Sequence, residues 1–349
     1  MFNINDLIRE NIKKLIPYSS ARDDFQGTAS IFLDANENSL GSPLVKWYNR
    51  YPDPHQLKMK QKLSEIKGLP VSSIFLGNGS DECIDILIRA FCEPGIDNII
   101  ICPPTYGMYE VSAAINNVAI KRVPLTASFQ LDLPAIEEAV DDYTKLIFIC
   151  SPNNPTGNSL NRQDVEALLN NYFGIVVIDE AYINFSRYRS FTLELAEYPN
   201  LVVMQTLSKA WGLAALRVGM AFGSEEIISV MSRIKPPYNI NQVSQELALQ
   251  ALEKVEEVNE MIREIVKERK ELEIKLPTLR AVKKVYESDA NFLLVEVTDA
   301  GALYRHLLEK EIVVRDRSKV ELCQGCLRIT VGTPEENNRL LKAIDAFPV

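Results

Sequence analysis

Short runs of apolar, often β-branched residues recur through the first two thirds of the chain, and each ends in a polar or Gly/Pro-rich cluster. We predict five strands: Ile99–Cys102, Leu146–Cys150, Ile175–Asp179, Leu201–Thr206 and Val218–Phe222. Segments with helical spacing separate several of them: Tyr106–Asn116, Leu133–Val140 and Arg162–Asn171. The runs lack polar alternation, as expected of parallel strands that are buried on both faces. This order predicts an α/β fold with a mostly parallel, doubly wound sheet.

The pattern changes near Asn241, where the chain becomes charged and apolar residues such as Val258 and Ile262 recur at helical spacing. We expect one or two long helices there, which lead into a smaller α/β unit. Its predicted strands are Phe292–Val297, Ile312–Arg315 and Leu327–Val331, and its predicted helices are Ala300–Glu309 and Pro334–Ala346. A chain of 349 residues suits two domains. We therefore expect an N-terminal arm (1–45) that packs with the small domain, a large domain (46–250) and a small C-terminal domain (251–349).

Composition excludes several classes of protein. The formal net charge is -9 and no Lys/Arg run stands out, which disfavours a nucleic-acid binder. No apolar run approaches the ~20 residues of a membrane span, and the N-terminal MFNINDLIRE lacks the apolar stretch of a signal peptide. We expect a cytoplasmic protein. The only histidines are His55 and His306, and the C-x-x-C pair Cys323 and Cys326 lacks two further ligands. We expect no metal site, and proton transfer through Lys, Asp or Tyr.

Three loops rich in polar and ionisable residues follow predicted strands. SPNNPTG follows Cys150, DEAY follows Ile178, and TLSKAWG follows Gln205. The carboxyl ends of parallel strands meet at one edge of a sheet, where ligands of open α/β sheets bind. The sequence therefore predicts a site at this edge.

Lys209 in TLSKAWG is the first candidate for catalysis. A lysine held against a sheet edge can lose its proton through desolvation and neighbouring positive charge, and can then attack a carbonyl. Ser208 precedes it and Arg217 follows eight residues later, and a hydroxyl and a guanidinium suit a phosphate group. A solvated surface lysine is the alternative for any single position of this kind.

Asp179 ends the strand IVVID, and an ionised carboxylate there needs a partner to offset the cost of burial. A protonated ring nitrogen would supply that partner, and Tyr182 would lie within reach of the same ring. The alternative for Asp179 is a helix N-cap. Asn154 in NNPTG has a turn role as its alternative.

An anion site is predicted upstream, where LGNGSDECIDILIRAF forms a glycine-containing turn that opens a helix. The backbone N–H groups of Gly79, Ser80 and Asp81 would face an anion at that helix N-terminus. Together with the three loops, this segment resembles the fold-type I pyridoxal 5'-phosphate (PLP) enzymes of the aspartate aminotransferase superfamily.

The resemblance implies a large PLP-binding domain in which Lys209 forms the Schiff base, Asp179 contacts the pyridine nitrogen, and Tyr182 contacts the phenolic oxygen. The catalytic residues would be these three. The implied cofactor-binding set is Gly79, Ser80, Asp81, Tyr106, Asn154, Asp179, Tyr182, Ser208, Lys209 and Arg217. The chain departs from the family at Trp211, where phenylalanine is usual, and at Ala215, where glycine is common.

Further segments are similar to the histidinol-phosphate aminotransferase family: IPYSSARDD, LDANENS, RYPDP, IRAFCEPG, PPTYGMYEVSA, IVVRDRS and CLRITVGTPEEN. This resemblance implies a homodimer with shared active sites, in which Tyr51 reaches the cofactor of the partner chain. The implied substrate contacts are Tyr18, Asn36, Arg315 and Arg328. The implied reaction converts L-histidinol phosphate and 2-oxoglutarate to imidazole acetol phosphate and L-glutamate in histidine biosynthesis.

Three alternatives share the scaffold. An aromatic amino-acid aminotransferase would keep every cofactor contact, so only substrate-side residues can discriminate. A threonine-phosphate decarboxylase would run a different reaction in the same cavity. A regulatory module would bind PLP without turnover; such modules usually carry a DNA-binding domain, for which we expect no room before the PLP-binding unit.

Overall fold

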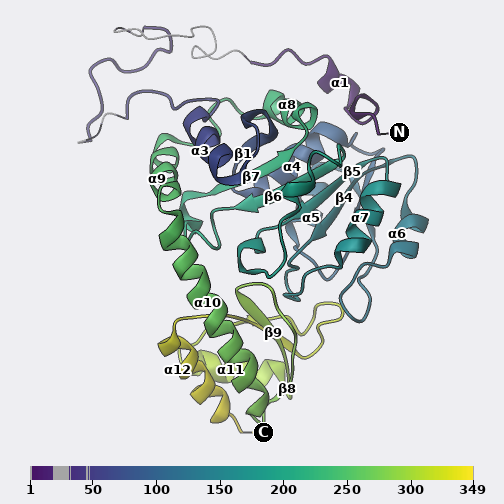
Figure 1. Ribbon diagram of the computed structural model, residues 1–349, viewed down its shortest axis with the longest axis vertical. Helices are drawn as coiled ribbons and strands as arrows, with labels where there is room; N and C mark the ends of the chain where they lie inside the picture. The colour runs from purple at the N-terminus through teal and green to yellow at the C-terminus, as the bar shows by residue number, and fades with distance from the viewer. Residues whose placement is uncertain (1, 19–30, 32, 45, 47, 349) are drawn as a thin grey trace.

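A seven-stranded sheet lies at the centre of the larger of two units (Figure 1). The computed structural model describes all residues except 1, 19–30, 32, 45, 47 and 349. The strands are β1 (Ile74–Asn78), β2 (Asn98–Ile101), β3 (Ala119–Arg122), β4 (Thr144–Cys150), β5 (Ile175–Asp179), β6 (Leu201–Thr206) and β7 (Val218–Gly223). Their order is β1-β7-β6-β5-β4-β2-β3. Strands β2 to β6 pair in parallel, and β7 pairs antiparallel with β1 and β6, so the mostly parallel sheet is confirmed.

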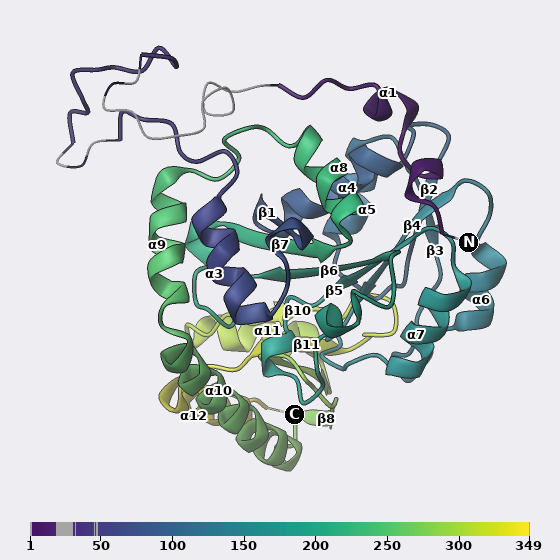
Figure 2. The ribbon, with the colours of Figure 1, turned by 45° about the horizontal axis from the view of Figure 1, so that its top comes forward.

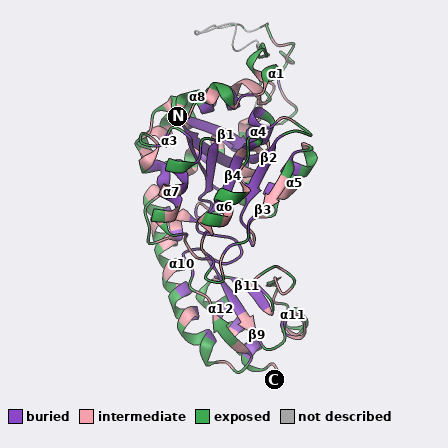
Figure 3. Cartoon of the chain, turned by 90° about the vertical axis from the view of Figure 1, so that its right-hand side faces the viewer, coloured by how far each residue is buried: buried purple, intermediate pink, exposed green. Residues whose placement is uncertain are grey.

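Helices cover both faces of this sheet (Figure 2). On one face lie α3 (Leu57–Lys67), α6 (Leu133–Ala139), α7 (Arg162–Asn171) and α9 (Gln242–Leu252), and on the other α4 (Ser80–Phe91), α5 (Met108–Ile115) and α8 (Glu225–Ile234). Alternate residues of one strand enter different cores: Ile147 packs with the first set of helices and Phe148 with the second. Burial on both faces explains the continuous apolar runs of the strands, which are coloured as buried in Figure 3.

The smaller unit is reached through the long helix α10 (Val255–Lys275). A break at Lys254 separates α10 from α9, so the charged stretch forms two helices. Four antiparallel strands follow in the order β10-β11-β9-β8. The elements are β8 (Val282–Val285), β9 (Phe292–Val297), α11 (Ala300–Glu309), β10 (Arg315–Asp316), β11 (Cys326–Thr330) and α12 (Pro334–Asp345). Among the described residues, none of the helices is both long and apolar enough to cross a membrane.

The first described residues of the N-terminal arm, from Phe2 to Ile12, pack against the large unit (Figure 1). Ile8 is buried in the core beneath α4 and α8, and the backbone N–H of Arg9 donates to the carbonyl of Ala90 at 3.2 Å. Arg9 also pairs with Glu93 at 3.0 Å. The expected packing of this arm with the small domain is not observed for these residues within this chain, because their apolar side chains complete the core beside α4. Short helices here are η1 (Ile4–Asp6) and α1 (Glu10–Lys13).

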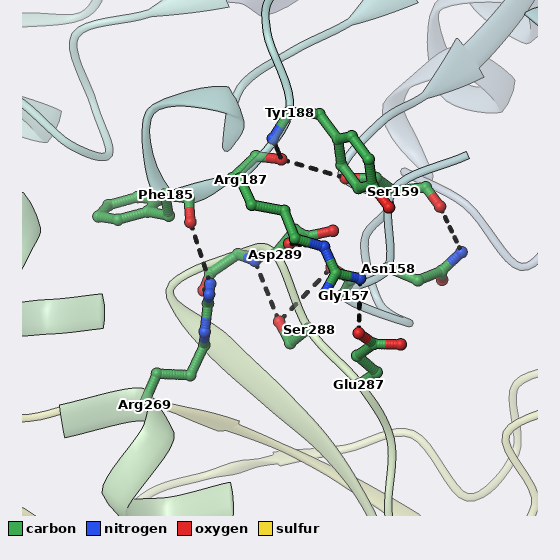
Figure 4. A network of polar contacts seen from close by, with 12 residues as sticks. Gly157, Asn158, Ser159, Phe185, Arg187, Tyr188, Arg269, Glu287, Ser288 and Asp289 are labelled. Atoms are coloured by element: carbon green, nitrogen blue, oxygen red, sulfur yellow. Dashed lines mark hydrogen bonds and ion pairs between the residues drawn. The ribbon is translucent and has the colours of Figure 1, made fainter. Parts of the chain in front are cut away.

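A polar network joins the two units beside the loop that follows β4 (Figure 4). The guanidinium of Arg269 on α10 donates to the carbonyls of Phe185 at 3.2 Å and Ala290 at 2.6 Å. The N–H of Asp289 donates to the carbonyl of Gly157 at 2.8 Å. These contacts fix the NNPTG loop of the large unit against the strand β9 of the small unit.

Candidate active site

A cavity of about 720 Å³ lies between the carboxyl edge of the large sheet and the small unit. The loops after β4, β5 and β6 all line it, as the sequence analysis expects. Predicted site residues in its lining are Ser80, Asp81, Tyr106, Asn154, Asp179, Tyr182, Ser208, Lys209, Arg217, Arg315 and Arg328. The fold therefore brings residues that are up to 248 positions apart in the sequence (80 to 328) into one cavity.

Lys209 lies in the turn after β6, where its carbonyl accepts a hydrogen bond from the N–H of Gly212 at 3.0 Å. Burial lowers the pKa of its ammonium, and the nearby positive charges of Arg328 and Arg217 lower it further. Asp179 and Asp81 partly oppose this shift. A lysine with a lowered pKa spends more time as the free amine, which is the nucleophilic and basic form.

Asp179 is buried at the end of β5, with only 3% of its surface exposed. The hydroxyl of Tyr109 donates to its Oδ2 at 2.7 Å, and the N–H of Ala181 donates to its Oδ1 at 3.0 Å. Burial raises the pKa of Asp179, and these two hydrogen bonds oppose the rise. Tyr109 is absent from our sequence-based set, although it lies in the same PPTYGMY segment as Tyr106. A buried carboxylate with this few donors suits a cationic ligand group.

The start of α4 forms a cradle with Arg217. Gly79 and Arg217 both have left-handed backbones, with φ of 79° and 54°. A Cβ at Gly79 would lie 2.5 Å from Nη2 of Arg217, so only glycine allows this approach. Arg217 pairs with Asp81 at 3.1 Å and reaches Ser208 Oγ at 3.5 Å. A helix N-terminus, a guanidinium and a hydroxyl together suit a phosphate group.

Two aromatic side chains, those of Tyr106 and Tyr182, also line the cavity. The hydroxyl of Tyr106 donates to Asp81 at 2.9 Å. Tyr182 is buried, and burial raises the pKa of its phenol well above the usual range. Asn154 links Tyr182 to the small unit, because its Nδ2 donates to the Tyr182 hydroxyl at 3.4 Å and its Oδ1 accepts from Arg328 at 2.5 Å.

Positive charge gathers at the small-unit side of the cavity. Arg315 on β10 and Arg328 on β11 are Cα partners, and the guanidinium of Arg328 lies 5.2 Å from the ring centroid of Phe292. Arg317 lines the same cavity and is missing from our sequence-based set. Its spacing from Arg315 was a usable signal, because residues two apart on a strand point to one face. Three guanidiniums near one lysine favour an anionic substrate.

Besides Gly79, which adjoins the cavity through Arg217, three predicted residues do not line the Lys209 cavity of their own chain. Asn36 and Tyr51 line a second cavity, of about 540 Å³, in which Tyr51 stacks on Tyr238 with ring centroids 4.5 Å apart. Tyr18 is 75% exposed. The expected substrate contacts of Tyr18 and Asn36 are therefore not made by this chain to its own cavity, and the assignment of Tyr51 to a partner chain stays a prediction.

Comparison with protein families decides the class. The model of aminotransferase class I and II matches residues 45–344. The chain belongs to this family. Its strand and helix order and the lysine at the carboxyl edge of the sheet are therefore features of a member of this family.

Individual relatives narrow the comparison. The chain is 56% identical over 344 residues to a histidinol-phosphate aminotransferase of Parabacteroides distasonis, with 99% of each chain covered. The structure of the enzyme of that name from Clostridium acetobutylicum matches with a TM-score of 0.79 and 25% identity, over 85% of this chain and 90% of that chain. The Sinorhizobium meliloti enzyme of that name, in complex with pyridoxal-5'-phosphate, shares the fold, with a TM-score of 0.78 and 22% identity over 85% and 82% of the chains.

The family cofactor, PLP, fits the residues of the cavity. Asp179 is a buried carboxylate that lacks an ion pair among the described residues and faces the cavity, which suits a protonated pyridine. Gly79 and Arg217 form a cradle at the helix N-terminus that suits the cofactor phosphate. Lys209 lines the same cavity, with a lowered pKa that suits bond formation to an aldehyde.

Proposed function

We propose that this protein is a PLP-dependent aminotransferase that converts L-histidinol phosphate and 2-oxoglutarate to imidazole acetol phosphate and L-glutamate in histidine biosynthesis. The observation that carries the proposal is the position of Arg328. Its guanidinium donates to Asn154 at 2.5 Å, and Asn154 donates to Tyr182, so an anion-binding group is held in the lining of the cavity that also contains the lysine. The identity with histidinol-phosphate aminotransferases over almost the whole chain supports the same substrate.

Lys209 carries the proton transfers in this proposal. PLP would be held covalently by Lys209 until the substrate amine displaces the lysine, and it would supply an electron sink for the carbon from which the proton leaves. The freed amine of Lys209 would take this proton as a general base and return it as a general acid. Its lowered pKa favours both tasks, because a base and acid of this kind works best with a pKa close to the working pH.

Asp179 would stabilise the positive charge of the pyridine nitrogen with its buried carboxylate. The hydroxyl of Tyr182 and the amide of Asn154 would orient the phenolic oxygen of the ring, and Tyr106 would stack on the ring. Arg217, Ser208 and the N–H groups at the start of α4 would bind the phosphate. The ring would then be fixed at both ends, and the C–H bond of the substrate that breaks would be oriented toward Lys209.

The two substrates need one anion site. Histidinol phosphate carries a phosphate ester and no α-carboxylate, whereas 2-oxoglutarate carries two carboxylates. We assign to Arg328 the phosphate of the first and the α-carboxylate of the second, because a planar guanidinium pairs with either group. Arg315 on the adjacent strand would add charge for the phosphate or the distal carboxylate.

The active form would be a cytoplasmic homodimer with shared sites. Tyr51, Asn36 and Tyr18 lie away from the Lys209 cavity of their own chain, and Tyr51 is half exposed, with 52% of its surface accessible. Contribution of Tyr51 to the cavity of a second copy would account for this placement. Mixing inactive Tyr51→Phe and Lys209→Ala proteins tests it: subunit exchange should rebuild one intact site per heterodimer, and proven exchange without recovered activity would contradict sharing.

The substrate assignment is tested by offering the purified holoenzyme L-histidinol phosphate, L-phenylalanine or L-threonine phosphate, each with 2-oxoglutarate. We expect the highest kcat/KM for glutamate formation with histidinol phosphate and no carbon dioxide release. A preference for phenylalanine would support the aromatic aminotransferase instead. Carbon dioxide from threonine phosphate would support the decarboxylase, and binding of PLP without turnover of any of the three would support a regulatory module.

A further inference from the structure

Arg317 is a charged side chain of the Lys209 cavity to which the proposed function gives no role. It follows directly after β10, and its N–H donates to the carbonyl of Cys326 at 3.0 Å, which continues the pairing with β11. The backbone is therefore fixed in register beside Arg328. Since alternate residues of an extended segment share a face, Arg317 points to the same side as Arg315.

The guanidinium of Arg317 has no counter-ion among the described residues. Within the part of the chain that the structure describes, it makes no ion pair, and its buried Nε has no hydrogen-bond acceptor. Burial lowers the pKa of Arg317, and the like charges of Arg328 and Arg315 lower it further. An unpaired, partly buried cation near two like charges destabilises the folded state. An anionic ligand would supply the missing partner.

We propose that Arg317 is a specificity-determining residue that selects substrates carrying a phosphate dianion. This proposal rests on the proposed function for the identity of the substrate, and it assigns one more residue to the recognition of that substrate. A phosphate ester carries nearly two negative charges at neutral pH and has three acceptor oxygens, whereas a carboxylate carries one charge and two oxygens. Arg315 and Arg328 can pair with a carboxylate between them. The third guanidinium matters once the anion brings a second charge.

Binding measurements on the PLP-loaded protein test this without turnover. The probes are glycerol 3-phosphate, a phosphate ester that has no amine to transfer, and acetate, a monoanion. The cofactor fills its own phosphate cradle in this form, so a phosphate probe reports on the substrate side. Titration calorimetry at about pH 8, well above the second pKa of a phosphate ester, keeps the probe dianionic. The variant is Arg317→Gln, and Arg305→Gln on the exposed side of α11 is the matched control.

We expect Arg317→Gln to raise the Kd of glycerol 3-phosphate by about 10-fold or more, which is the effect of losing one charged hydrogen bond. The Kd of acetate should rise by less than about 3-fold. Arg317→Lys should recover part of the affinity, because it restores the charge without the planar fork. The melting temperature of the ligand-free variant should equal or exceed that of the wild type, because a repulsive charge is removed. A purely structural residue would lower it.

The proposal is overturned if Arg317→Gln binds glycerol 3-phosphate as tightly as the wild type, or loses affinity for both probes equally. Wild-type protein that prefers acetate to glycerol 3-phosphate would overturn it as well. The proposed function fails separately, when wild-type protein does not transaminate histidinol phosphate. In turnover, Arg317→Gln should raise the KM for histidinol phosphate with little change in kcat, since the lost contact is equally present in ground and transition states.

Discussion

The hydroxyl of Tyr109 donates a 2.7 Å hydrogen bond to Oδ2 of Asp179 in a fully buried environment. This bond stabilises the ionised carboxylate, because it lowers a pKa that burial raises. It therefore connects α5, which carries Tyr109, to the residue proposed to hold the pyridine nitrogen. Tyr109 does not line the cavity, so its effect on chemistry would pass through Asp179.

Tyr109→Phe should raise the pKa of Asp179 and weaken its hold on a protonated ring. We expect kcat to fall about 10-fold and the acid limb of the pH profile of kcat/KM to move to higher pH, since a larger fraction of Asp179 is protonated at a given pH. The pH profile measured by stopped flow checks this. A profile that keeps its acid limb, with only a lower melting temperature, would mean that Tyr109 has a packing role alone.

Asp179→Asn separates folding from function. The pKa of Asp179 is higher in the folded state than in the unfolded state, so the folded state binds the proton more tightly. The protein therefore becomes less stable as the pH rises from the unfolded pKa of Asp179 through its folded pKa. The neutral amide avoids this cost. At neutral pH the cofactor-free variant should melt at the same temperature or slightly higher, because about 1 kcal/mol corresponds to 2–4 °C in chains of 150–250 residues and to less in a longer chain. Turnover should fall at least ~10-fold.

Calorimetric melting of the cofactor-free proteins and turnover of the loaded ones provide the check. A variant that melts lower at neutral pH but retains near-normal turnover would contradict both parts of the account. Such a result would leave Asp179 as a structural residue of β5.

Arg328→Gln should raise the pKa of Lys209, because Arg328 is the largest electrostatic cause of its lowered value after burial. In the cofactor-free protein, the reaction of Lys209 with an amine-directed reagent should slow at a fixed pH near neutral, since less free amine is present. Quantitative mass spectrometry of the labelled peptide over a pH series measures this. Arg305→Gln is the control, and an unchanged titration in Arg328→Gln would show that the two charges do not interact appreciably.

Gly157→Ala should disturb the joint between the units. A Cβ at Gly157, whose φ is 87°, would lie 2.7 Å from Oγ of Ser288. We expect a loss of about 1–3 kcal/mol in stability, and a lower kcat because the Asn154 loop shifts. Gly68→Ala is the matched control, because Gly68 also has a positive φ of 68° but nothing within 4 Å. Denaturant unfolding of both variants isolates the clash, and equal losses would mean that it is relieved.

Much of the site could be predicted because its residues end buried strands. Lys209, Asp179 and Asn154 follow β6, β5 and β4, whose apolar runs are clear in the sequence, and parallel pairing brings the three ends to one edge. The predicted bounds of β5 and β6 match the observed ones. The edge strand β3 was missed because its residues AIKR are partly exposed and carry two charges.

Other features depend on packing that no local pattern encodes. Tyr109 reaches Asp179 only because α5 packs against the sheet at one particular depth. The extent of the strand at Arg315 was also wrong, because β10 is just two residues long and begins at Arg315, whereas the predicted strand began at Ile312. The side chain of Ile8 could pack against either unit, and the core beside α4 and α8 decides which. Packing between helices and strands thus determined contacts that the sequence patterns could not predict.

The proposed function requires Lys209 to hold PLP in the cavity between the large sheet and the small unit. Sodium borohydride reduction of the PLP-loaded wild-type protein, followed by proteolysis and peptide mass spectrometry, tests it most directly. We predict a stable pyridoxyl modification on Lys209. Lys60 and Lys67 serve as internal comparisons, because burial also lowers their pKa although they lie outside the cavity, and they should remain unmodified. Modification of another lysine, with Lys209 unmodified, would contradict the account.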